Sequence, residues 1–227
     1  MIKKALVVAA AFAIASTATM AAGVNGATAS KDKRITSVPS GSGRYTPAQL
    51  PGKTPNVIFN NIGWKYPNGL YFCCYGDTIS GSTSQIGQTF WLAASFSPSE
   101  DATVKEIDAG VGWVSGANKV EITLYDDNGG VPGNVIATGE ASALGVFGDC
   151  CGLASMRIKG GAAVTGGSTY WVAVTTDGAA SNTWAAWNFN STDQINPVSV
   201  AASNGAGWTN LGGSVPAPSF AVIASKR

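Results

Sequence analysis

The sequence contains no histidine among its 227 residues. Histidine is the commonest general base near neutral pH and a frequent metal ligand, so its absence excludes Ser-His-Asp and Cys-His catalysis and histidine metal sites. Ser-Lys and paired-carboxylate chemistry stay open, and the candidates for a glycoside hydrolase are Asp77, Asp126, Asp127 and Asp149. Each lies near Gly or Asn in an apparent turn, where aspartate is favoured for local hydrogen bonding. We therefore expect no enzymatic activity and assign no catalytic residues.

Charged residues are also few, at 12% of the chain. Removing residues 1–29 takes away two of the fourteen Lys and Arg and none of the thirteen Asp and Glu, which leaves a formal charge of 12 − 13 = −1. Binding to nucleic acid or to an anionic membrane surface needs clustered Lys and Arg. The one such cluster, Lys31 to Arg34, is typical of a solvated tail, so neither partner is expected.

Long hydrophobic runs are missing except for residues 5–15, which follow Lys3 and Lys4 and precede a zone of small residues. This is the pattern of a secretory signal peptide. A membrane-spanning helix needs about 20 predominantly apolar residues, whereas Ser16 and Thr17 interrupt this run. We expect an exported bacterial protein, extracellular or alternatively periplasmic, with no membrane span after cleavage.

The cleavage site has two candidates. Ala27-Thr28-Ala29 matches the A-x-A pattern, while Met20-Ala21-Ala22 lies at a more usual distance from the apolar run. We expect cleavage after Ala29, with Ala22 as the alternative. Residues 30–55 carry four prolines and no apolar periodicity, which predicts a linker or an extension along a sheet edge. Residues 56–227 are expected to form one domain.

This domain is expected to be all-β. No run of helical period follows the signal peptide, and segments rich in Val, Ile, Thr and aromatic residues are cut off by Gly, Asn, Asp or Pro. In the segment 119–127, for example, Val120, Ile122 and Leu124 alternate with more polar residues. We predict nine to eleven short strands in two packed antiparallel sheets, a β-sandwich or jelly roll. The clearest strand candidates are 89–96, 104–114, 119–127, 154–160, 169–176, 183–189 and 219–225.

Four cysteines occur as two adjacent pairs, Cys73-Cys74 and Cys150-Cys151. In an oxidising compartment an even number of cysteines favours disulfides. Bridges between immediate neighbours are strained and rare, so we expect two bridges that join the two segments, either in parallel or crossed. A four-thiolate zinc site is the alternative, but its usual spacing leaves two to four residues between ligands. The predicted role of the bridges is structural.

The stretch YDDNGGVPG, residues 125–133, predicts a tight turn. Asn128-Gly129 suits positive φ, and Pro132-Gly133 suits the central positions of a type II turn. Asp126, Asp127 and Asn128 also offer oxygen ligands for a structural calcium ion. The EF-hand pattern is absent, so the expectation is no cofactor, with calcium as the alternative.

Seven tryptophans are many for this length. Trp91, Trp113 and Trp171 lie in strong strand patterns and are expected in the core. The candidates for an exposed platform that stacks on a ligand are Trp64, Trp184, Trp187 and Trp208. Trp64 and Trp208 lie among turn residues, whereas Trp184 and Trp187, three apart, face opposite sides of a regular strand, so at most one of the latter two is expected to be a platform.

Residues 85–195 resemble the bacterial exported domains called choice-of-anchor R, which often accompany PEP-CTERM sorting tails. The marks are LYDDNGGVPG at 124–133 and GGSTYWVAVTTD at 166–177 ahead of WAAWNFNSTD. The resemblance implies a secreted β-sandwich at the bacterial surface and supplies no catalytic residues. The chain departs from such proteins because its final apolar stretch, 220–224, is too short to span a bilayer, which favours a released protein.

Together these patterns predict an exported, non-enzymatic β-sandwich that acts at or outside the cell surface in binding or assembly. The partner is expected to be an extracellular glycan, another exported protein or a second copy of the chain. A carbohydrate-binding module with tryptophan platforms is the alternative function, and a paired-carboxylate glycoside hydrolase is the third.

Overall fold

The computed structural model describes the greater part of the chain from residue 56 onward and two short strands before it. Of those two strands, and of residues 72–74, only the backbone is described. Within these residues no helix has the length and apolar character needed to cross a membrane. The described stretches are 28–29, 34–36, 56–62, 72–149, 152–176, 178–190, 198–213 and 217–225.

The fold is built almost entirely of strands, with one short 3₁₀ turn, η1 (Gly178–Ala180), among the described residues. The strands are β1 (Thr28–Ala29), β2 (Arg34–Thr36), β3 (Asn56–Asn60), β4 (Phe72–Ser80), β5 (Trp91–Phe96), β6 (Ala102–Ala109), β7 (Val111–Ser115), β8 (Lys119–Asp127), β9 (Pro132–Ser142), β10 (Ala154–Val164), β11 (Tyr170–Thr175), β12 (Trp184–Phe189), β13 (Val200–Ser203), β14 (Trp208–Gly212) and β15 (Phe220–Ala224).

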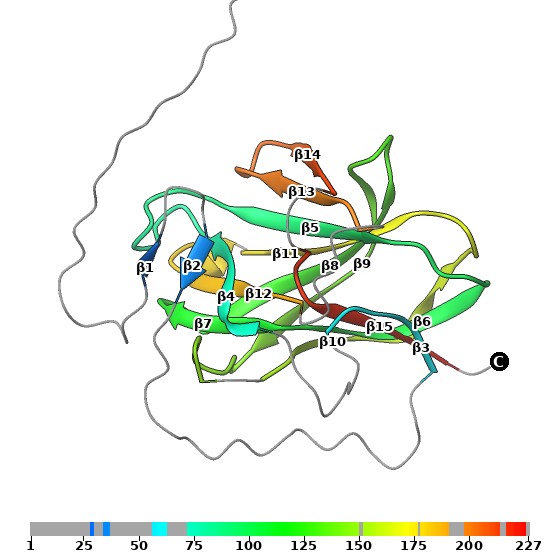
Figure 1. The fold of residues 1–227 in the computed structure, drawn as a ribbon, viewed down its shortest axis with the longest axis horizontal. Helices are drawn as coiled ribbons and strands as arrows, with labels where there is room; N and C mark the ends of the chain where they lie inside the picture. Colours follow the sequence, from blue (N-terminus) through cyan, green and yellow to red (C-terminus); the bar gives the residue numbers. More distant parts are fainter. Residues whose placement is uncertain are drawn as a thin grey trace, which may run out of the picture.

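One layer is a six-stranded antiparallel sheet in the order β14-β13-β5-β11-β8-β9. Figure 1 shows β13 and β14 at one border of the molecule, beside β5. The alternation that the sequence predicted holds in β8, where Val120, Ile122 and Leu124 are buried in the core. On the opposite face the hydroxyl groups of Thr123 and Thr138 lie 2.8 Å apart across β8 and β9.

The other layer consists of two shorter sheets, β1-β2-β4-β12-β7 and β10-β6-β15-β3. They meet at Gly110, the residue between β6 and β7. Its backbone N–H donates to the Ser219 carbonyl at 3.0 Å, and its carbonyl accepts from the Asn188 N–H at 2.8 Å. The chain therefore passes from one sheet into the other without a loop, and the two sheets form one bent layer.

The core lies between the layers. Val104, Ile107 and Ala109 of β6 share one hydrophobic cluster with Leu92 and Ala94 of β5 on the facing layer. Aromatic rings fill its centre: Phe220 stacks on Phe59 with ring centroids 4.6 Å apart and meets Phe96 and Trp187 edge-on at 6.2 Å. Burial of each such side chain contributes about 1.5–3 kcal/mol.

The predicted all-β sandwich is confirmed. The strand candidates correspond to β5, β8, β10, β11, β12 and β15, and the segment 104–114 divides at Gly110 between β6 and β7. The structure adds strands that the sequence patterns missed, including β9, β13 and β14. Within the segment predicted to be a linker or edge extension, Arg34–Thr36 pairs with β4.

The turn after β8 was predicted only in part. Gly129 and Gly130 have positive φ, and the Asn128 N–H donates to the Val131 carbonyl at 2.9 Å, so a tight turn is present. The prediction of a type II turn at Pro132-Gly133 is wrong, because both residues belong to β9. Pro132 pairs directly with Asp127, which places the whole reversal in residues 128–131.

Candidate functional site

The outer face of the six-stranded sheet carries the partly exposed aromatic residues Trp208 and Tyr125. Tyr125 follows Leu124 on β8 and therefore points away from the core. Trp208 begins β14 and pairs with Ser203 on β13. The two rings meet edge to face, with centroids 6.2 Å apart and an interplanar angle of 71°. We call this pair, with Asp127 and Asn210 beside it, the hairpin site.

Small residues bring these rings together. Ala93, Ala173 and Ala201 lie side by side on the outer face of β5, β11 and β13, and all three are fully buried. Trp208 and Tyr125 pack against them and against Trp171. Because alanine leaves room above the sheet, Trp208 covers this cluster with part of its surface and exposes the rest to solvent. The prediction that Trp208 is exposed therefore holds only in part.

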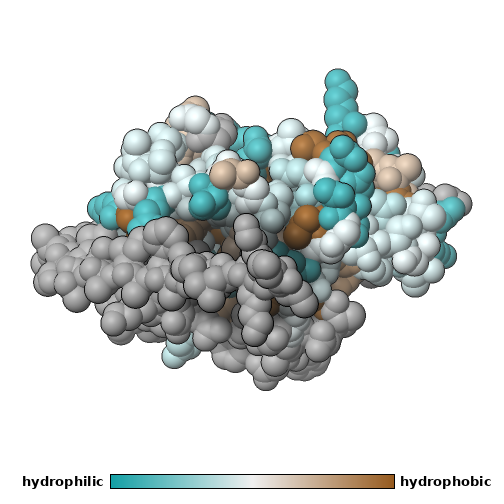
Figure 2. All heavy atoms as spheres, turned by 90° about the horizontal axis from the view of Figure 1, so that it is seen from above, coloured by the Kyte–Doolittle hydropathy of each residue, from teal (hydrophilic) through white to brown (hydrophobic). Residues whose placement is uncertain are grey.

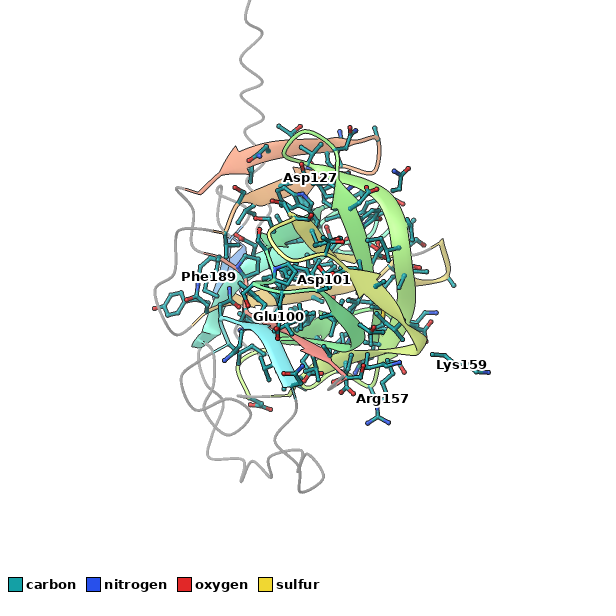
Figure 3. All side chains as sticks on the ribbon, turned by 90° about the vertical axis from the view of Figure 1, so that its right-hand side faces the viewer. Glu100, Asp101, Asp127, Arg157, Lys159 and Phe189 are labelled. Atoms are coloured by element: carbon teal, nitrogen blue, oxygen red, sulfur yellow. The ribbon has the colours of Figure 1, made fainter. Side chains whose placement is uncertain are left out.

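Polar groups at the hairpin site are held in place by protein donors. The buried Trp171 indole N–H donates to the Asp127 carboxylate at 2.7 Å, and the Gly130 backbone N–H donates to the same carboxylate at 3.1 Å. The Asn210 amide donates to the Gly130 carbonyl and accepts from the Gly212 N–H. In Figure 3 Asp127 lies close to the hairpin of β13 and β14. The turn and the hairpin therefore fix each other.

Burial raises the pKa of Tyr125 above its usual value. Glu121 raises it further, whereas a hydrogen bond with Thr123 opposes the shift. The phenol is therefore neutral at ordinary pH and acts at this site as a hydrogen-bonding group.

Neither of the tryptophans on β12 is a platform, which corrects that expectation. Trp184 has 2% of its surface exposed and Trp187 has none. They do face opposite sides of the strand, as predicted: Trp187 lies in the main core, and Trp184 packs with Val114 and Phe147 in a separate outer cluster. Trp64 lies outside the described residues.

The outer cluster is buried because another segment lies against β7. The Trp113 backbone N–H donates to the Gly145 carbonyl at 2.7 Å, and the Phe147 backbone N–H donates to the Trp113 carbonyl at 2.8 Å. Phe147 lies so close that a side chain at Gly112 would collide with its backbone. The indole N–H of Trp184 is buried there without a hydrogen-bond partner.

The other tryptophans divide between core and surface. Trp171 is buried as predicted, whereas Trp91 and Trp113 are only partly buried. Their indole N–H groups donate to the Thr176 hydroxyl and to the Gly116 carbonyl, respectively.

Of the calcium candidates, Asp126 and Asp127 end β8, and Asn128 begins the turn to β9. The Asp126 carboxylate accepts hydrogen bonds from the backbone and the side chain of Asn134. Both carboxylates thus receive N–H donors from the protein, which is the typical role of aspartate in a turn. Among the described residues no group of three or more acidic, cysteine or histidine side chains gathers as metal ligands do. Calcium binding stays a prediction.

The four hydrolase candidates do not converge. Asp126 and Asp127 lie at the end of β8, Asp77 lies in β4 on the other layer, and Asp149 follows the segment that pairs with β7. The structure instead brings together a pair that the sequence reasoning missed, Glu106 and Asp108 on β6. These side chains are two residues apart on a strand, a spacing that puts both on one face and could have identified them.

This acidic pair lies on the outer face of the four-stranded sheet. Asp108 is only 2% exposed and accepts a hydrogen bond from the Ser155 hydroxyl, and Arg157 lies 3.2 Å from the Glu106 carboxylate. Burial raises the pKa of Glu106, and the Asp108 carboxylate raises it further, while Arg157 opposes the shift.

The first of the two cysteine segments belongs to the five-stranded sheet. Cys73 and Cys74 lie in β4, of which the backbone is described there, and Cys150 and Cys151 lie outside the described residues. The segment before Cys150 pairs with β7, and β12 lies between β7 and β4. The disulfide bridges therefore stay a prediction.

Comparisons with known proteins found no match for this chain. No protein-family model matches the chain. No curated protein and no solved structure matches it either. The resemblance to choice-of-anchor R domains stays an expectation from the motifs alone, and the function has to be inferred from the chain's own geometry.

Proposed function

We propose that this chain is an exported, non-enzymatic β-sandwich protein that binds a partner at or outside the bacterial cell surface through the hairpin site. The observation that supports this most is the partly exposed Trp208 ring, which packs edge to face with Tyr125. Exposed Asp127 and Asn210 lie beside it, and their side chains are already ordered by hydrogen bonds. An ordered site loses less conformational entropy when a ligand binds.

The carboxylates favour binding over hydrolysis. A glycoside hydrolase needs two carboxyl groups about 5–10 Å apart, on either side of the bond that is cleaved. The Ser155 hydroxyl donates to Asp108 and Arg157 pairs with Glu106, so protein groups already hold these two carboxylates. Asp126 accepts hydrogen bonds from Asn134 of β9, and Asp127 accepts them from Gly130 of the turn and from the Trp171 indole.

Carbohydrate binding is the second candidate function, and the composition of the hairpin site favours it. An aromatic ring offers an apolar surface for the C–H face of a sugar, while amide and carboxylate groups at its border offer hydrogen bonds to hydroxyl groups. Trp208, Asn210 and Asp127 provide these three functions on one face of the sheet.

Assembly by strand addition has less support. The register of β14 shifts at Leu211, which leaves only a short regular edge, and the edge of β7 is already paired with Val146. Short and bulged edges are devices that prevent sheets from pairing with other chains. Figure 2 shows small, separate hydrophobic areas on the described part of the face seen from above, rather than one continuous patch.

A glycan array and a screen of exported proteins, each run with the wild type and with Trp208→Ala, test the proposal. Loss of the ring should weaken binding of a retained partner by about tenfold or more, as for aromatic residues that dominate interfaces. Tyr75→Ala is the matched control, because Tyr75 is 52% exposed on the other layer. Equal binding by wild type and Trp208→Ala would refute the hairpin site, and retention of proteins but no glycans would remove the carbohydrate candidate.

Sizing the purified protein across a concentration series tests the assembly alternative. We expect a single monomeric species at every concentration. An apparent molecular mass that rises with concentration would favour self-association over the hairpin site as the basis of function.

A further inference from the structure

Strands β1 and β2, the first two among the described residues, are part of the five-stranded sheet. Thr28 pairs with Thr36 and Ala29 with Ile35, in antiparallel register. Ile35 then pairs with Gly76, and Thr36 with Tyr75, so β2 lies between β1 and β4. Residues 30–33 connect β1 to β2, a length that is common in β-hairpins. β1 is therefore the outermost strand of the five-stranded sheet.

The two candidate cleavage sites treat this hairpin differently. A cut after Ala29 removes β1 entirely and leaves β2, a strand of three residues, as the sheet edge. A cut after Ala22 leaves residues 23–29 on the mature chain, and the hairpin remains complete. The backbone N–H and C=O groups that β2 directs toward β1 keep their partners only in the second case.

We propose that signal peptidase cuts this chain after Ala22 and that the mature protein begins at Gly23. This inference rests on the export proposed above. The A-x-A pattern favours Ala29, but Ala22 also places a small residue at the cut and lies closer to the apolar run 5–15. The pairing of Thr28 and Ala29 with β2 decides between them, because strands of the native sheet belong to the mature chain.

Intact-mass analysis and N-terminal sequencing of the exported protein test this directly. The full chain is produced with its own N-terminus in a Gram-negative host, and the periplasm and the medium are analysed separately. An N-terminus at Gly23 supports the proposal. An N-terminus at Ser30 overturns it and leaves export intact, whereas uncleaved protein retained in the cell overturns both this inference and the proposed export.

Two matched substitutions sharpen the test. Signal peptidase needs a small residue immediately before the cut, so Ala22→Leu should abolish processing at Gly23, and the precursor should accumulate. Ala29→Leu makes the same change at the other candidate and should leave the N-terminus at Gly23. The reverse result, with processing lost in Ala29→Leu and unchanged in Ala22→Leu, would overturn the proposal without depending on how stably either variant folds.

Discussion

Two pairs of acidic side chains are held in different ways: Asp126 and Asp127 at the end of β8, next to the turn (the turn pair), and Glu106 and Asp108 on β6 (the strand pair). Asp126 and Asp127 accept hydrogen bonds from backbone and side-chain N–H groups, among them the buried indole of Trp171. Glu106 and Asp108 face each other and depend on the Ser155 hydroxyl and on Arg157. Figure 3 shows Asp127 and Arg157 at opposite borders of the molecule.

The difference follows from local backbone geometry. Adjacent residues at the end of a strand can direct their carboxylates to different donors, and the turn supplies N–H groups. Residues two apart on a strand share one face, so their charges repel unless one takes up a proton or a cation intervenes. The turn pair is therefore expected to stabilise the fold at neutral pH, and the strand pair to be sensitive to pH.

The largest effect is expected from Asp127→Ala. This change leaves the indole N–H of Trp171 without an acceptor, although Trp171 is almost fully buried. An unpaired buried donor costs about 1–3 kcal/mol, so the free energy of unfolding should fall by about 2 kcal/mol. Chemical denaturation at neutral pH measures this loss.

Asp126→Ala is the control for that prediction. It removes the same charge one residue away, but its carboxylate accepts from Asn134, which is exposed. Water can replace these bonds, so the loss should be about 1 kcal/mol or less. Equal losses for the two variants would mean that charge, and not the bond to the buried indole, explains the contribution of Asp127.

The hydrogen bond between Asp127 and Trp171 is a contact that local sequence patterns could not predict. Alternation identified β8 and β11 and placed Trp171 in the interior, because side-chain direction in a strand is a local property. The bond joins residues 44 apart in the chain, and no local pattern encodes which strands become neighbours. The turn was thus predictable, whereas its link to the core was not.

The same limit explains the tryptophans of β12. Their opposite directions followed from the strand period, but their exposure depended on segments far away in the sequence. The segment 145–147 pairs along the edge of β7, and its Phe147 packs against Trp184, while Phe220 of β15 lies against Trp187. Glu106 and Asp108, by contrast, could be predicted to share a face from the strand period alone, because they lie two residues apart in β6.

Glu106→Gln should have a smaller and opposite effect, raising the free energy of unfolding near pH 7. The pKa of Glu106 is raised in the folded protein, so the folded state binds its proton more tightly than the unfolded state does. The stability that this proton provides is complete below the usual glutamate pKa of about 4.3 and is lost as the pH rises through the folded value. Glutamine keeps a hydrogen-bond donor toward Asp108 at every pH.

Denaturation curves from about pH 4 to pH 8, recorded for the wild type and for Glu106→Gln, measure this difference. The wild type should lose stability relative to the variant as the pH rises, and the two should converge at the acidic end. A constant difference across the range would show that Glu106 does not titrate against Asp108.

The smallest effect is expected from Arg157→Ala. The Arg157 side chain is 81% exposed, and exposed ion pairs contribute about 0–1 kcal/mol. Because Arg157 lowers the pKa of Glu106, its removal should raise that pKa further and extend the loss of stability to higher pH. The variant should match the wild type below the titration of Glu106, where the carboxyl group is neutral, and fall about 0.5 kcal/mol below it at pH 8. If the deficit is the same at both ends, Arg157 acts through packing of its aliphatic chain and not through its charge.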